Sequence, residues 1–457
     1  MFGTNGIREV VGQKLTVRFV TDLASAVAYV HPGPGPAVVG TDARTSSPAL
    51  GRVVSGALSM AGLKVLEIGV LPTPAIQYNV KALRATFGLI VTASHNPPEF
   101  NGLKGIAPDG LEFTKETERA VEAAYAGGKF LAQPYDRIGE IGQDTQGASR
   151  YVEGILSRVS GDAIRKRKLR VVLDCSNGAS VVTSPMLLAR LGARYVTLNA
   201  NPDGTFPGHN SEPTEDNLQG LVQYVRTAGA DFGVAHDGDA DRAVFVDERG
   251  VYVPGEKILT LLARETIKLN GGGTVVTPVT SSDAVAEVIA PYGGKVHFTR
   301  VGSPVVSRAM QEQKGAFGGE ENGGLIFADH QLARDGAMSL ARVMDVLVSS
   351  GRTLSQLVAD LPPYHLVKRK VRCPIALREK VLAEIPALMD RGNASEVSTL
   401  DGVKVRTPEG WVLVRPSGTE PIYRIFAESR DRKTAEGIAE KMAKGVESLV
   451  ASMEGAA

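Results

Sequence analysis

Along the first 360 residues, short apolar runs alternate with segments whose apolar positions recur every three or four residues. An apolar run at 37–44 ends in polar residues, a helical pattern fills 49–64, and a second apolar run follows at 65–70. Short apolar runs are typical of buried strands, and the longer period is typical of helices. The same order returns at 169–200 and at 273–300. The pattern predicts a recurring βα unit of strand, polar turn, helix and strand.

The C-terminal hundred residues follow a different pattern. Strand-like segments at 365–374, 401–417 and 422–429 are flanked by helical patterns at 377–390 and 433–453. The letters TPEG within the second segment predict a hairpin turn. An antiparallel sheet with helices on one face is an α+β arrangement.

The predicted fold class is therefore α/β, with three related mixed α/β domains and a smaller α+β C-terminal domain. A chain of 457 residues is too long for a single hydrophobic core, which agrees with several domains. The sequence places these domains at 1–145, 146–245, 246–360 and 361–457.

Composition limits the partners that the chain is expected to have. Lys plus Arg number 51 and Asp plus Glu number 50, so no overall field attracts nucleic acid or a membrane surface. No apolar run approaches the roughly 20 residues that span a bilayer, and the first residues lack a signal-peptide pattern. The only two cysteines, Cys175 and Cys373, suit a reducing compartment. We expect a cytoplasmic protein without a nucleic-acid or membrane partner.

The segment VAHDGDADRA places Asp237, Asp239 and Asp241 on alternate positions after an apolar strand. Alternate side chains of an extended segment share one face, so three carboxylates would face one point. Hard oxygen ligands of this kind favour Mg²⁺. An EF-hand would use Glu248 as its twelfth residue, but Arg242 stands where that loop requires Gly. The segment is also compatible with a phosphorylated aspartate nucleophile or with a solvated acidic turn.

The segment VTASHNPPEFNGLKG delivers Ser94 from an apolar strand into a turn that two prolines stiffen. His95 follows directly, and Lys104 lies ten residues further along the chain. Lys104 could return to the same pocket as a general acid or base, or as a charge that holds a ligand. The segment is therefore a candidate for covalent chemistry at a serine.

Two further segments carry residues suited to a phosphorylated sugar. In FGGEENGGLIFADH, glycines surround Glu320 and Asn322, whose side chains can bind the adjacent hydroxyls of a sugar. In VRPSGTEPIYRIF, guanidinium groups and hydroxyls surround a glycine turn, which is a usual way to bind a phosphate dianion. The first segment could instead be an acidic surface turn, and the second a hairpin with incidental arginines.

The motifs TASHNP, DGDADR, GEENGG and RPSGTEP, in this order, resemble those of the α-D-phosphohexomutase superfamily. That superfamily includes phosphoglucomutases, phosphomannomutases and phosphoglucosamine mutases. The resemblance covers essentially the whole chain, beginning with FGTNGIR. It implies four domains around a central cleft. It also implies reversible transfer of phosphate between O1 and O6 of a hexose, through a phosphoserine and a hexose 1,6-bisphosphate that also serves as activator.

The resemblance assigns a role to each motif residue. It implies a phosphoserine at Ser94 and one Mg²⁺ per active site, held by the metal ligands Ser94, Asp237, Asp239 and Asp241. The residues that it places in the catalytic pocket are Ser94, Arg8, His95, Lys104 and Arg242. The residues that it implies for the substrate are Glu320 and Asn322 at the sugar and Arg415, Ser417, Gly418, Thr419 and Arg424 at the phosphate that does not react.

Two departures from the superfamily leave the sugar open. Many relatives carry Ser at the position of Asn322, and some carry His or Asp at the position of Ser303. The substrate could be glucosamine phosphate or glucose or mannose phosphate. A sugar-phosphate phosphatase and a non-catalytic metal or sugar-phosphate-binding protein are the rival functions, and the sequence leaves a homodimer open.

Overall fold

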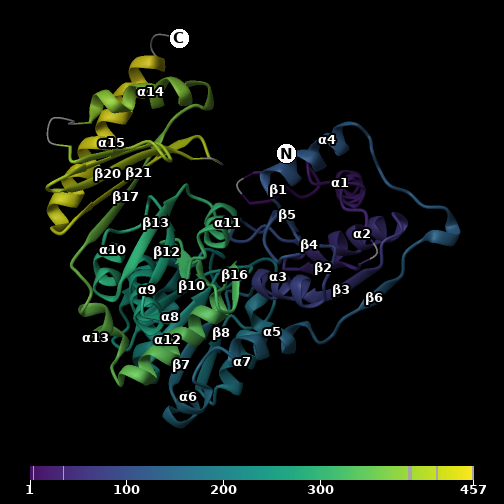
Figure 1. Ribbon diagram of the computed structural model, residues 1–457, viewed down its shortest axis with the longest axis horizontal. Coiled ribbons are helices and arrows are strands. Elements are labelled where there is room, and N and C mark those ends of the chain that lie inside the picture. Colours follow the sequence, from purple (N-terminus) through teal and green to yellow (C-terminus); the bar gives the residue numbers. More distant parts are fainter. Residues whose placement is uncertain (4, 34, 390–393, 418–419, 455–457) are drawn as a thin grey trace.

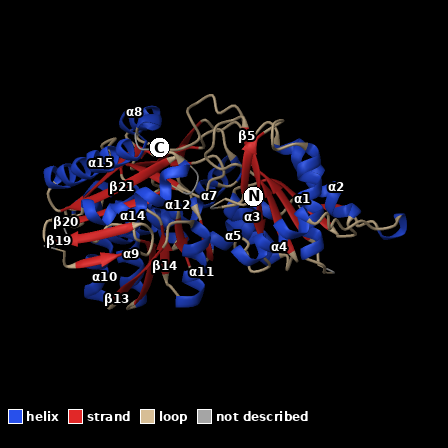
Figure 2. Cartoon of the chain, turned by 90° about the horizontal axis from the view of Figure 1, so that it is seen from above, coloured by secondary structure: helices blue, strands red, loops and turns tan. Residues whose placement is uncertain are grey.

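The chain forms four sheets, three of them mixed and one antiparallel, in a computed structural model that describes residues 1–454 apart from 4, 34, 390–393 and 418–419. The first sheet with its helices and the fourth sheet lie at opposite sides of the molecule (Figures 1 and 2). The second and third sheets lie together beneath the fourth in Figure 1. The α/β class is confirmed.

The first unit is a six-stranded sheet in the order β1-β5-β4-β2-β3-β6. Its strands are β1 (Ile7–Val10), β2 (Ala37–Thr41), β3 (Val65–Val70), β4 (Phe87–Val91), β5 (Phe100–Ile106) and β6 (Ile141–Gln143). Its helices are α1 (Val17–Val30), α2 (Ser47–Met60), α3 (Thr73–Ala82) and α4 (Lys115–Ala126).

The second unit is a five-stranded sheet in the order β11-β10-β9-β7-β8. Its strands are β7 (Arg170–Asp174), β8 (Arg194–Leu198), β9 (Phe232–His236), β10 (Ala243–Asp247) and β11 (Tyr252–Val253). The helices in this part of the chain are α5 (Gly147–Leu156), α6 (Gly161–Arg167), α7 (Ser184–Arg190) and α8 (Gln219–Ala228).

The third unit repeats this size, with the order β13-β12-β14-β15-β16. Its strands are β12 (Gly273–Pro278), β13 (Gly294–Thr299), β14 (Phe317–Gly319), β15 (Leu325–Phe327) and β16 (Gln331–Arg334). Its helices are α9 (Gly255–Asn270), α10 (Ala284–Ile289), α11 (Ser303–Gln313), α12 (Gly336–Ser350) and α13 (Leu354–Ala359).

The first three sheets share one topology. In each, a central strand pairs in parallel on both sides, and the third parallel strand turns back into an antiparallel neighbour. The turns in question are β4–β5, β9–β10 and β14–β15. These three turns carry Ser94, the aspartates and Glu320, so three of the sequence motifs occupy equivalent places in three repeats.

The fourth sheet is antiparallel throughout, in the order β17-β21-β20-β19-β18. Its strands are β17 (His365–Arg372), β18 (Glu396–Ser398), β19 (Val403–Thr407), β20 (Gly410–Pro416) and β21 (Ile422–Ser429), and its helices are α14 (Arg378–Leu388) and α15 (Arg432–Glu454). Thr407 pairs with Gly410, which confirms the hairpin predicted at TPEG.

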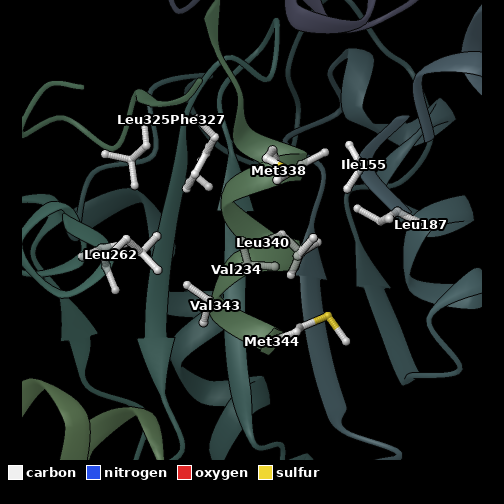
Figure 3. Packing of buried hydrophobic residues seen from close by; sticks show 14 of the residues in the cluster. Ile155, Leu187, Val234, Leu262, Leu325, Phe327, Met338, Leu340, Val343 and Met344 are labelled. Atoms are coloured by element: carbon white, nitrogen blue, oxygen red, sulfur yellow. The ribbon is translucent and has the colours of Figure 1, made fainter. Parts of the chain in front are cut away.

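One hydrophobic core extends from the first unit through the second and third. Helix α12 lies in its middle, where Met338 and Val343 are buried among side chains of the neighbouring elements (Figure 3). Those neighbours include Val234 of β9, Leu262 of α9 and side chains of α5, α7 and β15. The fourth unit has a core of its own between its sheet and α14 and α15.

The division between the second and third units lies later than the sequence places it. Position 246 falls inside β10, because the hairpin to β11 completes the second sheet. We therefore place this division between Val253 and α9. In the described part of the chain, no helix combines the length and the apolar character that a membrane span needs.

Candidate functional site

Ser94 lies in the turn between β4 and β5, within a segment that we call the serine loop (Thr92–Glu99). Its side chain is completely buried, and its backbone has a φ of +53°, which L-residues seldom adopt. The guanidinium of Arg44 holds this conformation, because it donates to the main-chain oxygens of Ser94 at 2.8 Å and Asn96 at 2.5 Å. It also donates to the main-chain oxygens of Pro97 and Phe100.

The aspartate loop (Asp237–Arg242) connects β9 to β10. Oxygen atoms from Asp237, Asp239 and Asp241 lie within 4.8 Å of one another, and all three side chains are buried. The prediction of an extended segment was wrong, because these residues form a turn in which Ala240 has a φ of +55°. The turn brings the carboxylates together all the same. Their burial contradicts a solvated acidic turn.

The flanks of the aspartate loop contradict the EF-hand interpretation. They are antiparallel strands, whereas an EF-hand loop joins two helices. Glu248, which would be its twelfth residue, accepts hydrogen bonds from the backbone and side chain of Ser355 at the start of α13.

The serine and aspartate loops are in direct contact. Ser94 Oγ lies 3.2 Å from Asp237 Oδ2. Gly238 packs so closely that a Cβ there would lie 2.6 Å from the main-chain oxygen of Ser94. The chain therefore places a serine hydroxyl beside the carboxylates, with no room between the two backbones.

Lys104 is the closest counter-charge of Asp239. Its Nζ lies 2.6 Å from Asp239 Oδ2, which also accepts the Thr73 hydroxyl at 2.7 Å. Burial opposes the charge on Asp239, but Lys104 and Thr73 outweigh it, and the pKa of Asp239 is lowered. Burial and the charges of Asp241 and Asp239 raise the pKa of Asp237.

The aspartate loop suits Mg²⁺. The Oδ1 atoms of Asp239 and Asp241 are buried and have no hydrogen-bond partner among the described residues. Burying a carboxylate oxygen without a hydrogen-bond partner costs free energy, and a bound cation would offset that cost. Carboxylate oxygens are the ligands that Mg²⁺ prefers.

Three further predicted residues surround Ser94. Arg8 Nη1 donates to Asn96 Oδ1 at 2.9 Å, within the serine loop. Arg242 Nη2 lies 3.2 Å from His95 Nδ1, which is 3.3 Å from Ser94 Oγ. The charge of Arg242, with burial, lowers the pKa of His95, so the imidazole is neutral. Because a guanidinium only donates, His95 Nδ1 accepts from Arg242, and the proton of the neutral ring lies on Nε2.

The GEEN loop (Glu320–Gly324) approaches the aspartate loop through a residue that sequence reasoning missed. Arg334, at the end of β16, donates to Asp241 Oδ2 at 2.5 Å and to Glu320 Oε2 at 2.7 Å. Burial opposes the charge of Arg334, but Asp241, Glu320 and Glu112 together raise its pKa. Asn322 Oδ1 accepts from the backbone of Gly324 at 3.1 Å.

The predicted phosphate residues lie on the fourth sheet. Arg415 and Arg424 are paired across β20 and β21, Arg415 Nε donates to Asp401 Oδ2 at 3.1 Å, and Arg424 pairs with Glu420. Ser417 is buried, and its Oγ accepts from the backbone of Glu420 at 3.2 Å. Gly418 and Thr419 lie outside the described residues.

Asp401 links this part of the fourth sheet to the third unit. Besides Arg415, it accepts from the backbone of Val301 at 2.9 Å. Val301 precedes Gly302, whose backbone donates to Glu320 Oε1 at 3.1 Å. Hydrogen bonds, together with the short backbone segments between them, thus connect all four units.

Family models match nearly the whole chain. They are described as Phosphoglucomutase/phosphomannomutase, alpha/beta/alpha domain I at residues 1–132, domain II at 149–250 and domain III at 254–364, and the C-terminal domain at 366–445.

Similar proteins agree with these matches. A phosphoglucomutase/phosphomannomutase of Thermococcus kodakarensis is 40% identical over 100% of this chain and 99% of its own. A phosphoglucosamine/phosphogalactosamine mutase of Sulfurisphaera tokodaii is 36% identical over 98% and 99%. The crystal structure of a phosphoglucomutase/phosphomannomutase family protein of Burkholderia thailandensis superposes with a TM-score of 0.87, at 26% identity, over 98% of this chain and 97% of that one.

Proposed function

The chain belongs to the phosphoglucomutase/phosphomannomutase family and is a phosphohexomutase. We propose that it interconverts hexose 1-phosphate and hexose 6-phosphate through a phosphoserine at Ser94. The observation that carries the proposal is the contact of Ser94 Oγ with Asp237, inside a cluster of buried carboxylates. Glucosamine, glucose and mannose phosphates are the substrates to compare.

The proposed reaction has two transfers. In the first, the bond between Ser94 Oγ and phosphorus breaks while the free hydroxyl of the sugar phosphate bonds to phosphorus, which yields a hexose 1,6-bisphosphate. After the bisphosphate turns over in the cleft, its other phosphate returns to Ser94. A hexose 1,6-bisphosphate supplied from outside would phosphorylate an unmodified Ser94 and thus act as activator.

The described side chains would serve this reaction mainly by position and charge. Asp237, Asp239 and Asp241 would hold Mg²⁺ together with the phosphate on Ser94, and bound Mg²⁺ supplies positive charge next to the transferred group. Arg242 and Arg8 contact the two residues that follow Ser94, and they would neutralise the remaining charge.

One residue must take the proton of the attacking hydroxyl. We assign this role to Lys104, which reaches the aspartate loop from β5. Lys104 would enter the first transfer as a neutral amine, take the proton of the attacking hydroxyl, and return it to the sugar oxygen that leaves phosphorus in the second transfer.

The remaining motifs would bind the sugar phosphate itself. Glu320 and Asn322 would bind hydroxyls, and the residues around Arg415 and Ser417 would bind the phosphate that does not react. Asp401 joins these two parts through Val301. The fourth unit has a separate core, so it can move toward the cleft as a body and exclude water from the phosphoserine.

A phosphorus NMR assay tests this function. The purified protein would meet glucose, mannose and glucosamine phosphates with Mg²⁺ and a trace of hexose 1,6-bisphosphate. We expect the 1-phosphate and 6-phosphate signals to interconvert without free phosphate, and we expect Ser94→Ala to abolish this. Free phosphate would indicate a phosphatase, activity retained in Ser94→Ala would indicate an aspartate nucleophile, and no change in any signal would favour a binding protein.

A further inference from the structure

Three side chains meet beside Glu320, in a place that the proposed reaction does not yet use. Ser303, the first residue of α11, follows Gly302, whose backbone binds Glu320. Asn5 Nδ2 donates to Ser303 Oγ at 2.9 Å. Ser303 Oγ in turn lies 3.4 Å from Glu112 Oε1. We call Asn5, Glu112 and Ser303 the junction cluster, because it joins the first unit to the third.

The junction cluster contains two buried acceptor atoms without a donor. Glu112 is only 8% exposed, and its Oε2 has no hydrogen-bond partner among the described residues. The same holds for Asn5 Oδ1. The other carboxylate oxygen, Glu112 Oε1, has only long contacts, at 3.4 Å to Ser303 and 3.5 Å to Asn5. A buried carboxylate so weakly bound is costly to keep.

The charge of Arg334 acts on Glu112, but no hydrogen bond joins the two side chains among the described residues. Within the described residues Glu112 takes part in no ion pair. Arg308 donates from Nη2 to the main-chain oxygen of Glu112, while its Nη1 pairs with Asp109 at 2.5 Å. Arg334 donates to Glu320 and Asp241. Arg334 directs its printed hydrogen bonds to other carboxylates, so Glu112 Oε2 stays without a donor for a ligand that lies against Glu320 to supply.

The two acceptor atoms without a donor indicate the chemistry of that ligand. A sugar hydroxyl offers one donor and no charge, whereas an ammonium group offers three donors and a positive charge. Mg²⁺ fits the junction cluster poorly, because it contains a single carboxylate, and the aspartate loop supplies three. An ammonium group would satisfy Glu112 Oε2 and Asn5 Oδ1 together.

We propose that Glu112 and Asn5 are specificity-determining residues that bind an ammonium group on the sugar ring, so that the preferred substrate is an amino sugar phosphate such as glucosamine phosphate. This inference rests on the proposed function, since it assumes that the sugar lies against Glu320. It assigns the preference to two residues of the first unit, outside the GEEN loop.

Equilibrium binding to the non-reacting Ser94→Ala protein tests the inference directly. Titration calorimetry would compare glucosamine 6-phosphate, N-acetylglucosamine 6-phosphate and glucose 6-phosphate. We expect the protein to bind glucosamine 6-phosphate at least tenfold more tightly than the other two, neither of which carries an ammonium group. Equal affinity for all three would overturn the inference.

The variant Glu112→Gln removes the charge and keeps the shape. In the Ser94→Ala background, the affinity for glucosamine 6-phosphate is expected to fall at least tenfold, while that for glucose 6-phosphate changes less than threefold. With Ser94 intact, the ratio of the two kcat/KM values is expected to fall by the same factor. An equal loss for both sugars would show a structural role and overturn the assignment.

Glu116→Gln is the matched control, because it removes the same charge from an exposed position in α4. It is expected to leave the preference unchanged. If Glu112→Gln fails to fold, the affinities of the Ser94→Ala protein with Glu112 intact for the three sugar phosphates still test the inference. The outcomes separate this inference from the proposed function. If the wild-type protein isomerises every sugar phosphate without preferring the amino sugar, only this inference is refuted. If it isomerises none of them, the proposed function is refuted.

Discussion

Arg334 is the residue on which two loops depend. Its side chain is 7% exposed and bridges Asp241 and Glu320. We expect Arg334→Met to lower the free energy of unfolding by about 3–5 kcal/mol, because it removes the closest cationic partner of two buried carboxylates. We also expect turnover to fall at least tenfold. Thermal unfolding and the phosphorus assay measure both effects.

The control for this variant is Arg352→Met, which breaks a half-exposed pair with Asp360. Solvent screens such a pair, so its loss is expected to change stability little. Similar unfolding temperatures for the two variants would contradict the prediction that the bridge from Arg334 to Asp241 and Glu320 stabilises the fold.

Lys404 provides a pH prediction at the boundary between the third and fourth units. Its ammonium lies 3.7 Å from the ring centre of Trp411 and donates to the main-chain oxygen of Val279 at 2.8 Å. Burial lowers the pKa of Lys404 to about 8. Trp411 is the only tryptophan of the chain, so its fluorescence is expected to change with a midpoint near pH 8. Lys404→Met should abolish that change.

The same group affects stability with a definite sign. Below about pH 8 the folded and unfolded chains both carry the proton on Lys404. Between there and the ordinary lysine pKa of 10.5, only the unfolded chain carries it, so the contribution of Lys404 to the free energy of unfolding rises with pH. Denaturant unfolding of the wild type and Lys404→Met at about pH 7 and about pH 9.5 measures this. A difference between them that stays constant would contradict the assignment.

Sequence reasoning predicted site residues from compact motifs and missed residues that contact those motifs from elsewhere in the chain. Ser94 and the aspartates stand in compact motifs. Arg44 reaches a serine loop 50 positions away, and Arg334 reaches Asp241 across 93 positions. A lone arginine in a strand or after one has no local signature, so only the fold reveals these contacts.

At the scale of elements, the equivalence of three turns explains how the site assembles. The turns β4–β5, β9–β10 and β14–β15 leave their sheets at the same topological place, and each carries one motif. The sequence predicted the parallel strands and crossover helices well, because their apolar patterns are strong. It could not predict the antiparallel strands β10, β11, β15 and β16 as parts of the same sheets, since pairing depends on partners elsewhere in the chain.

The close packing of two of these turns predicts the effect of one methyl group. Gly238→Ala would place a Cβ 2.6 Å from the main-chain oxygen of Ser94, which Arg44 also binds. The serine loop must then shift, and we expect turnover to fall at least tenfold in the phosphorus assay. Such a shift would misalign the Ser94 hydroxyl, and phosphoryl transfer requires alignment of the reacting groups.

Gly220→Ala serves as the matched change for this prediction. Gly220 lies in α8, and a Cβ there would have no neighbour within 4 Å. We expect full activity and a gain of up to about 1 kcal/mol, because alanine favours a helix over glycine. If Gly238→Ala is also fully active, the prediction is wrong, and the serine and aspartate loops can move apart without loss of activity.

At the scale of the whole molecule, the four units divide into two cooperative parts. A single core joins the first three units through α12, whereas the fourth has a separate core. The third and fourth units meet in a small apolar cluster, where Val279 packs with Trp411 and Phe426, and in several polar contacts. The polar contacts include the pair of Arg406 with Asp283, and the bonds from Lys404 to Val279 and from Val301 to Asp401. The sequence predicted four separate domains, but apolar patterns do not tell which cores merge.

Calorimetry can test this division with two equivalent core truncations. Leu262 of α9 is buried in the large core, and Ile425 of β21 is buried in the core of the fourth unit. Each change to alanine is expected to cost about 2–5 kcal/mol. If the two parts unfold separately, Leu262→Ala lowers one transition and Ile425→Ala lowers the other. A single transition that both variants lower equally would show that the contacts between the third and fourth units couple the parts fully. The fourth unit could then not move as a body over the cleft.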